Sequence, residues 1–245
     1  MKLTNRTITR KMPVLEDGAD TYHLPLQRQE PTTWKELHKA NYGINPENNT
    51  PLKQQTFPQA IRLITKALQR KQDERFLPVI EGLHRYVITG DSLALWTPQG
   101  LYGIDHPSKD LIAQLNKDNQ QELLKIQEGL DKRLSGASGS TVSTSEDGYV
   151  RFADHDNIIY DSQDRKTFGG NPGLIVVAGN KTSARALANS SKAYDSDPAF
   201  FGIGKTNNLT VRVPGVYSND FDGRLGVYSD GFPDCDGRVS FGVAN

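Results

Sequence analysis

Aspartates that could bind a divalent cation gather between Gly215 and Val243, where GVYS and DGR each occur twice. Calcium takes several oxygen ligands that converge from alternating positions of one loop. The spacing departs from the EF-hand pattern in both possible alignments of the loop. A loop that starts at Ser218 has Ser229, and one that starts at Phe232 has Val243, where the pattern requires a glutamate. Asp-Gly pairs also suit tight hairpin turns. The sequence favours turns, and the alternative is a cation site with the ligands Asp220, Asp222, Asp234 and Asp236.

The stretch GLIVVAGNKTSARAL offers a second chemistry, the binding of a phosphate or another small anion. An apolar strand leading into a helix would bring backbone N–H groups and the positive end of the helix dipole together. The Walker pattern is not met, because Ile175 and Asn180 stand where its glycines would be. Capping of the helix by Thr182 or Ser183 is the simpler interpretation. The alternative is an anion site made by Asn180, Lys181 and Thr182.

A third candidate is a basic stripe on the helix that begins near Phe57. Arg62, Lys66 and Arg70 stand four residues apart and so share one helix face. A nucleic-acid-binding helix has such a stripe, but a solvated face of an ordinary amphipathic helix has it as well. No nucleic-acid-binding motif accompanies the stripe, so nucleic acid is the less favoured partner.

Patterns of established catalytic sites are not found in the sequence. The five histidines have no metal-ligand spacing, and no nucleophile elbow of the GxSxG type occurs. The single cysteine, Cys235, lies between Asp234 and Asp236, and these carboxylates disfavour its thiolate. In the segment ADHDN, a strand would turn His155 away from the aspartates on either side. We therefore expect a protein without enzymatic activity and without a cofactor, apart from the alternative of a divalent cation.

The elements that must position these candidates differ between two parts of the chain. In residues 1–134 we expect a hairpin in 12–26, helices in 32–43 and 56–72, a three-stranded meander in 84–107 and helical structure over 108–134. Asn119 interrupts that last helical pattern. The helix from residue 56 has an apolar stripe at 3/4 spacing, which predicts burial of one side; the stripe consists of Phe57, Ile61, Ile64 and Leu68.

Residues 149–245 are richer in turn and strand signals. We expect a hairpin in 148–164, a buried strand in 171–179, a helix in 180–194 and a short strand in 198–204. The order of strand, helix and strand predicts one βαβ crossover. Three further strands, about 209–218, 224–229 and 237–243, would form a meander whose turns hold the aspartates.

The composition and the boundary complete the sequence-based prediction. The chain has 245 residues, 36% hydrophobic and 24% charged, with a formal net charge of zero, so no global field favours nucleic acid or an anionic membrane. Residues 135–148 are rich in Ser and Gly, which predicts a flexible linker between regions 1–134 and 149–245. The predicted fold is α+β, with an N-terminal helix-plus-meander region and a C-terminal β-rich region that holds the βαβ unit.

The function that these observations favour is a non-catalytic binding or structural module that acts through protein contacts or self-association. No secretory signal and no apolar segment of membrane-spanning length occurs in the sequence, so we expect a cytoplasmic location and no membrane partner. The first alternative is a small-molecule or phosphate-binding domain, or an enzyme, at the GNKTS segment. The second is nucleic-acid association through the basic helix.

Overall fold

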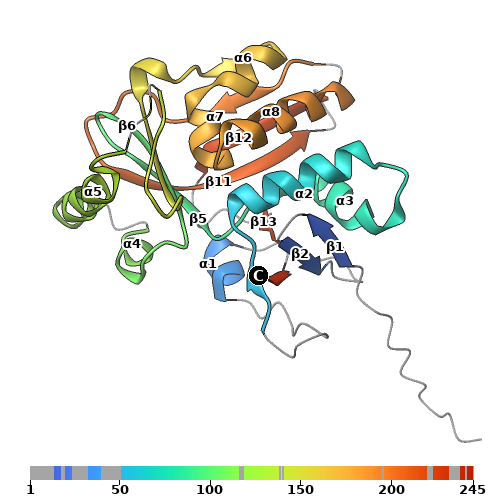
Figure 1. Cartoon of the computed structure of the whole chain (residues 1–245), viewed down its shortest axis with the longest axis horizontal. Coiled ribbons are helices and arrows are strands. Elements are labelled where there is room, and N and C mark those ends of the chain that lie inside the picture. Colours follow the sequence, from blue (N-terminus) through green and yellow to red (C-terminus); the bar gives the residue numbers. More distant parts are fainter. Residues whose placement is uncertain are drawn as a thin grey trace, which may run out of the picture.

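The computed structural model of this protein describes residues 14–17, 20–23, 33–39, 51–115, 119–137, 139, 141–194, 196–219, 223–231, 238–240 and 242–244. Helices cover a mixed sheet, which confirms the predicted α+β class (Figure 1). No helix in the described residues combines the length and the apolar character needed to cross a membrane.

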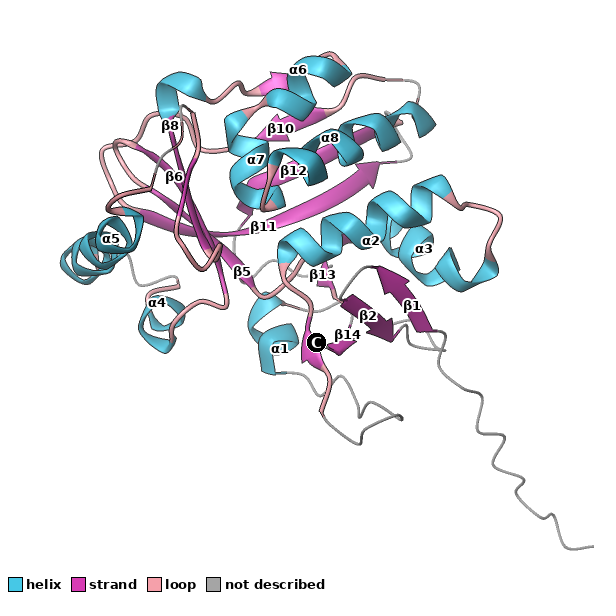
Figure 2. Cartoon of the chain, viewed as in Figure 1, coloured by secondary structure: helices cyan, strands magenta, loops and turns pink. Residues whose placement is uncertain are grey.

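A sheet of ten strands forms the centre of the molecule (Figure 2). Its main path follows the order β7–β8–β6–β5–β11–β12–β10–β9, and β4 pairs with both β11 and β13. The pairs β10–β12 and β4–β13 are parallel, and the others are antiparallel. The strands are β4 (Val87–Ile88), β5 (Ser92–Trp96), β6 (Gly100–Asp105), β7 (Ser143–Thr144), β8 (Val150–Asp154), β9 (Asp161–Ser162), β10 (Ala199–Phe201), β11 (Thr210–Asn219), β12 (Arg224–Gly231) and β13 (Arg238–Val239).

A second, smaller sheet brings the two ends of the described chain together. Its order is β1–β2–β14–β3, and all of its pairs are antiparallel. The hairpin expected in 12–26 is confirmed by β1 and β2, whose turn residues lie outside the described part. The strands are β1 (Val14–Asp17), β2 (Asp20–His23), β3 (Lys53–Gln54) and β14 (Gly242–Ala244).

A layer of five helices packs against one face of the large sheet. The helix expected from residue 56 is confirmed by α2: Thr56 and Gln59 form a reciprocal capping box at its start. Its apolar stripe is buried in the larger hydrophobic core. The helices of this layer are α2 (Phe57–Gln69), α3 (Leu77–Arg85), α6 (Arg165–Gly170), α7 (Pro172–Ala178) and α8 (Lys181–Ser190).

The opposite face of β5, β6 and β8 is covered by α4 and α5. Asn119 caps α5 by accepting a hydrogen bond from the backbone of Glu122. The helical stretch expected over 108–134 is therefore divided into two helices, and the second begins where Asn119 interrupts the apolar stripe. Leu123 and Leu130 pack in a second core with sheet residues, and Trp34 of α1 joins this core. The helices are α1 (Trp34–Lys39), α4 (Lys109–Ala113) and α5 (Gln120–Leu134); three short 3-10 turns are Glu74–Phe76, His155–Asn157 and Ser191–Ala193.

The strand predicted over 171–179 is wrong: residues 172–178 form helix α7. Asn171 caps this helix by accepting from the backbone of Gly173, and Pro172 occupies its first turn. Every residue of α7 is buried, because the helix lies between the sheet and the helices α2 and α8. A helix buried on all sides has the same apolar run as a buried strand. The predicted βαβ crossover through this segment therefore does not form.

Three further strand pairings differ from the sequence-based prediction. In the three-stranded meander expected in 84–107, β5 pairs with β6, but β4 pairs with β11 and β13 and not with β5. The strands in 148–164 are not a hairpin, since β8 pairs with β6 and β7 and β9 pairs with β10. The hairpin of about 209–218 and 224–229 is confirmed by β11 and β12. The expected third strand of that meander is split instead, because β13 pairs with β4 and β14 joins the small sheet.

The large sheet contains strands from both sides of residues 135–148. β5 lies directly beside β11, with Leu95 opposite Val211. Within the segment, β7 pairs with β8, and Asp147 accepts a hydrogen bond from Arg133 at 2.6 Å. The predicted division into two regions, 1–134 and 149–245, joined by a flexible linker stays a prediction.

Candidate functional site

The two GVYS repeats pair with each other in the β11–β12 hairpin. Val216 lies opposite Val227, and each tyrosine lies opposite the glycine of the other repeat: Tyr217 opposite Gly226, and Tyr228 opposite Gly215. A glycine opposite an aromatic residue leaves room for the ring to lie over the neighbouring strand. The repeat is therefore a cross-strand pairing unit.

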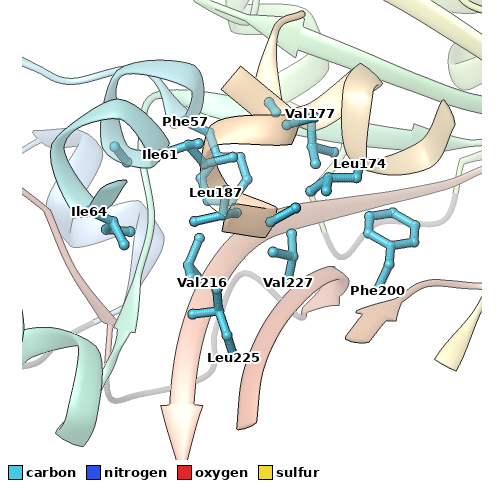
Figure 3. Close-up of a cluster of buried hydrophobic side chains, with 14 of the residues drawn as sticks. Phe57, Ile61, Ile64, Leu174, Val177, Leu187, Phe200, Val216, Leu225 and Val227 are labelled. Atoms are coloured by element: carbon cyan, nitrogen blue, oxygen red, sulfur yellow. The ribbon is translucent and has the colours of Figure 1, made fainter. Parts of the chain in front are cut away.

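Alternation along the two strands separates the repeat into an inner and an outer face. Val216, Leu225 and Val227 point into the core beneath the helix layer, where they meet Leu174 and Leu187 (Figure 3). The tyrosines of the repeats point to the other face and are half-buried. One face of the hairpin thus holds the fold together, while the other presents polar-tipped aromatic side chains.

Three aromatic rings form a continuous patch on that outer face, which we name the aromatic surface: Phe201, Tyr217 and Tyr228. The rings of Phe201 and Tyr228 stack with centroids 4.7 Å apart, and the ring of Tyr217 follows at 6.3 Å from that of Tyr228. Tyrosine combines a large contact area with few rotatable bonds, which makes it a frequent anchor in binding surfaces.

The candidate cation ligands Asp220, Asp222, Asp234 and Asp236 lie outside the described residues. Gly223, directly before β12, has a φ of 56°, a left-handed conformation that glycine adopts readily. Among the described residues no group of three or more His, Cys, Asp or Glu side chains could hold a metal ion. The cation site stays a prediction.

A buried polar network connects the start of α2 to the sheet. The backbone N–H of Phe57 donates to Ser92 Oγ at 2.8 Å, and that hydroxyl donates to Asp105 Oδ1 at 2.6 Å. Arg151 donates to Asp105 Oδ2 at 2.8 Å and to two carbonyls, those of Val176 and Gly148. The two charged side chains are only 3% and 6% exposed. This fully bonded ion pair is an element of structure.

A cavity of about 410 Å³ lies beside this network. It brings together one residue of the predicted basic stripe and one residue of the predicted anion site, which are far apart in the sequence. Its wall includes Arg62 and Asn180, together with Asp105, His106 and Arg151. Asp91 bridges His38 and His106 at 3.0 Å each. Burial opposes ionisation of Asp91, but the bonds to the histidines outweigh it and lower its pKa. The same bond raises the pKa of His106.

The residues of the predicted anion site separate in the structure. Asn180 is the cap of α8 and accepts from the backbone of Ser183 at 2.8 Å, so the cap lies two or three residues earlier than predicted. Thr182 is exposed and faces α2, whereas Lys181 is exposed and faces α6. An anion site at these residues stays a prediction, with Lys181 directed away from the cavity that Asn180 lines.

The basic stripe is divided as well. Arg62 and Lys66 line a cavity of about 280 Å³ between α2 and α8. Arg70 ends α2 as its C-cap, and its backbone N–H donates to the carbonyls of Lys66 and Ala67.

His155 is buried, stacks on Trp96 and donates to the Thr97 carbonyl at 2.9 Å, which gives this histidine a structural role.

Sequence reasoning missed the aromatic surface and the Asp105–Arg151 pair. For the aromatic surface, the GVYS repeat was the available signal. Two copies on either side of a turn form neighbouring strands, and each strand then carries one tyrosine. Phe201 carried no such signal, because its contact with Tyr228 depends on the parallel pairing of β10 with β12. Residues 105 and 151 are brought together only by the pairing of β6 with β8.

Comparison with known proteins identifies the class of fold. No protein-family model matches the sequence, and no curated protein sequence matches it. A similar solved structure is described as "Accommodation of massive sequence variation in Nanoarchaeota by the C-type lectin fold". The two chains are 12% identical, with a TM-score of 0.50 over 90% of this chain and 97% of that one. At this identity the similarity concerns the fold, which is that of a C-type lectin.

Proposed function

We propose that this protein is a non-catalytic binding module that contacts a protein partner, or a second copy of itself, through the aromatic surface. The observation that carries the proposal is the arrangement of Phe201, Tyr217 and Tyr228 on the face of the β10–β12 strands opposite the helix layer. Stacked, half-buried rings lose little side-chain entropy when a partner covers them.

The similar structure supports a binding role through its fold. That structure describes a C-type lectin fold that accommodates massive sequence variation. In the present chain, the inner residues Val216, Leu225 and Val227 carry the packing of the hairpin. Its outer residues contribute less to the core, so exchanges there change the binding surface at small cost to the fold. We infer that partner choice resides in the outer residues of β11 and β12.

Affinity capture with matched variants tests this function. The wild-type protein, a Tyr217→Ser/Tyr228→Ser variant and a Tyr149→Ser variant would be immobilised and exposed to an extract of the encoding organism. Tyr149 is an exposed tyrosine, at 46%, on the segment before β8 and serves as the control. Quantitative mass spectrometry should find partners that the wild type and the control retain and the double variant loses.

Self-association is tested in parallel by sedimentation velocity. A wild-type dimer that the double variant does not form would identify the partner as a second copy. Monomeric protein at all concentrations, combined with identical capture by the wild type and the double variant, would exclude the aromatic surface as the binding site. The expected cytoplasmic location stays a prediction that cell fractionation can check.

A further inference from the structure

A second surface, separate from the aromatic surface, lies on the outside of the helix layer. α8 lies between α2 and α6 and packs against both (Figure 2). Every charged side chain within α2, α6, α7 and α8 is a lysine or an arginine. We name this surface the basic helix face; its cations are Arg62, Lys66, Arg165, Lys166, Lys181 and Arg185.

The concentration of one charge sign is notable because the whole chain has a formal net charge of zero. The acid Asp164 lies at the edge of this face as the cap of α6, and it accepts bonds from the backbone of Lys166 and Thr167. A surface with one sign of charge attracts partners of the opposite sign. The charge pattern therefore points to a polyanionic partner.

Two hollows run along the sides of α8. The hollow between α2 and α8, about 280 Å³, is lined by Arg62 and Lys66 with Thr182. The hollow between α6 and α8, about 590 Å³, is lined by the cations Arg165, Lys166, Lys181 and Arg185, together with Asn189 and small residues. Cations interleaved with hydroxyl and amide groups are the side chains that contact phosphate and sugar in nucleic acids.

The side chains between the cations favour nucleic acid over protein or membrane. In the described chain, no exposed large hydrophobic residue belongs to α2, α6 or α8. A protein interface has aromatic or aliphatic anchors at its centre, and a membrane-binding helix has them on its buried side. We propose that the basic helix face binds nucleic acid through its phosphates, without reading the base sequence.

Fluorescence anisotropy with a labelled single-stranded DNA of about 25 nucleotides and mixed sequence tests the proposal. The wild type should bind at about 50 mM salt and weaken steeply as salt rises. The test variant replaces four cations of the face by glutamine: Arg62, Lys66, Lys181 and Arg185. The control makes the same charge change at exposed lysines elsewhere: Lys39, Lys53, Lys109 and Lys132.

The affinity of the test variant should be lower than that of the wild type by a factor of about ten or more. The control should bind like the wild type. Each phosphate contact contributes about 0.7 to the slope of log affinity against log salt, so the slope should fall by about 3. Equal weakening of test and control, or no wild-type binding at low salt, would refute the proposal. Circular dichroism checks folding; if the test variant unfolds, the pairs Arg62/Lys66 and Lys181/Arg185 are replaced separately.

Competition identifies the class of polyanion. Unlabelled polyglutamate and phosphatidylserine vesicles, added at equal charge concentration, should displace the DNA far less well than unlabelled DNA does. Displacement by polyglutamate as effective as that by DNA would assign the face to an acidic protein instead. Equal displacement by the vesicles would assign it to a membrane surface, and both results would overturn the proposal.

Discussion

The two ends of the large sheet are packed differently. At the β5–β6–β8 end, one face contacts α7 in the larger core and the other contacts α4 and α5 in the second core. At the β10–β12 end, the helix layer covers one face, while the aromatic surface occupies the other and is half-buried. The first end is covered on both faces, whereas the second has one face of half-buried aromatic rings, which we propose as the binding surface.

The strands themselves show this difference. All residues of β5 and β6 are buried, whereas β12 contains both buried and half-buried positions. A strand covered on both faces has little freedom to exchange residues, because each change creates a cavity or a clash. An outer position on a half-covered strand can change at small cost. The comparison predicts different responses to mutation at the two ends.

The largest effect is expected from Arg151→Ala at the doubly covered end. The substitution leaves Asp105 charged and buried without its partner, which should lower the free energy of unfolding by about 3–5 kcal/mol. Urea denaturation would measure the loss, with the exposed Lys132→Ala as the control. A loss no larger than that of the control would show that the Asp105–Arg151 pair does not stabilise the pairing of β6 with β8.

An intermediate effect is expected at the half-covered end, and it separates the two faces of one hairpin. Leu225→Ala removes a fully buried side chain and should cost about 2–5 kcal/mol. Tyr217→Thr, on the outer face, keeps a residue with strand preference and should cost about 1 kcal/mol or less. Thermal and urea unfolding of both variants would test this, and equal losses would contradict the assignment of an inner structural and an outer binding face.

The smallest effect is expected from pH at the edge of the doubly covered end, where Asp91 bonds to His106. The pKa of His106 is raised in the folded protein, so its contribution is full below the unfolded value of about 6.5 and disappears as pH rises through the folded value. The pKa of Asp91 is lowered in the folded protein. Its carboxylate therefore stabilises the fold fully above the unfolded pKa of about 3.8, and this stabilisation disappears as pH falls through the folded pKa.

Because His106 is partly exposed, the change should be less than about 1 kcal/mol. The free energy of unfolding should fall between about pH 6 and pH 8 in the wild type. In His106→Gln, which cannot titrate, this part of the slope should be absent. An unchanged slope in the variant would assign the pH dependence to other groups.

Sequence alone determined the elements whose signals are local. The helices that begin at Phe57 and Gln120 follow from the caps Thr56 and Asn119, because a cap and its backbone partner lie within three residues. The hairpins β1–β2 and β11–β12 follow from turn residues between short strands. The α+β class and the candidate turns at the C-terminal repeats rest on the same local chemistry.

Tertiary structure alone decided what depends on distant neighbours. The apolar run 172–178 is compatible with a buried strand or a buried helix, and its place between the sheet and α8 selects the helix. The contact of Phe201 with Tyr228 and the Asp105–Arg151 pair require particular strand pairings. The basic helix face needs three helices side by side. Such partners are chosen by the packing of the whole chain, which no short stretch of residues encodes by itself.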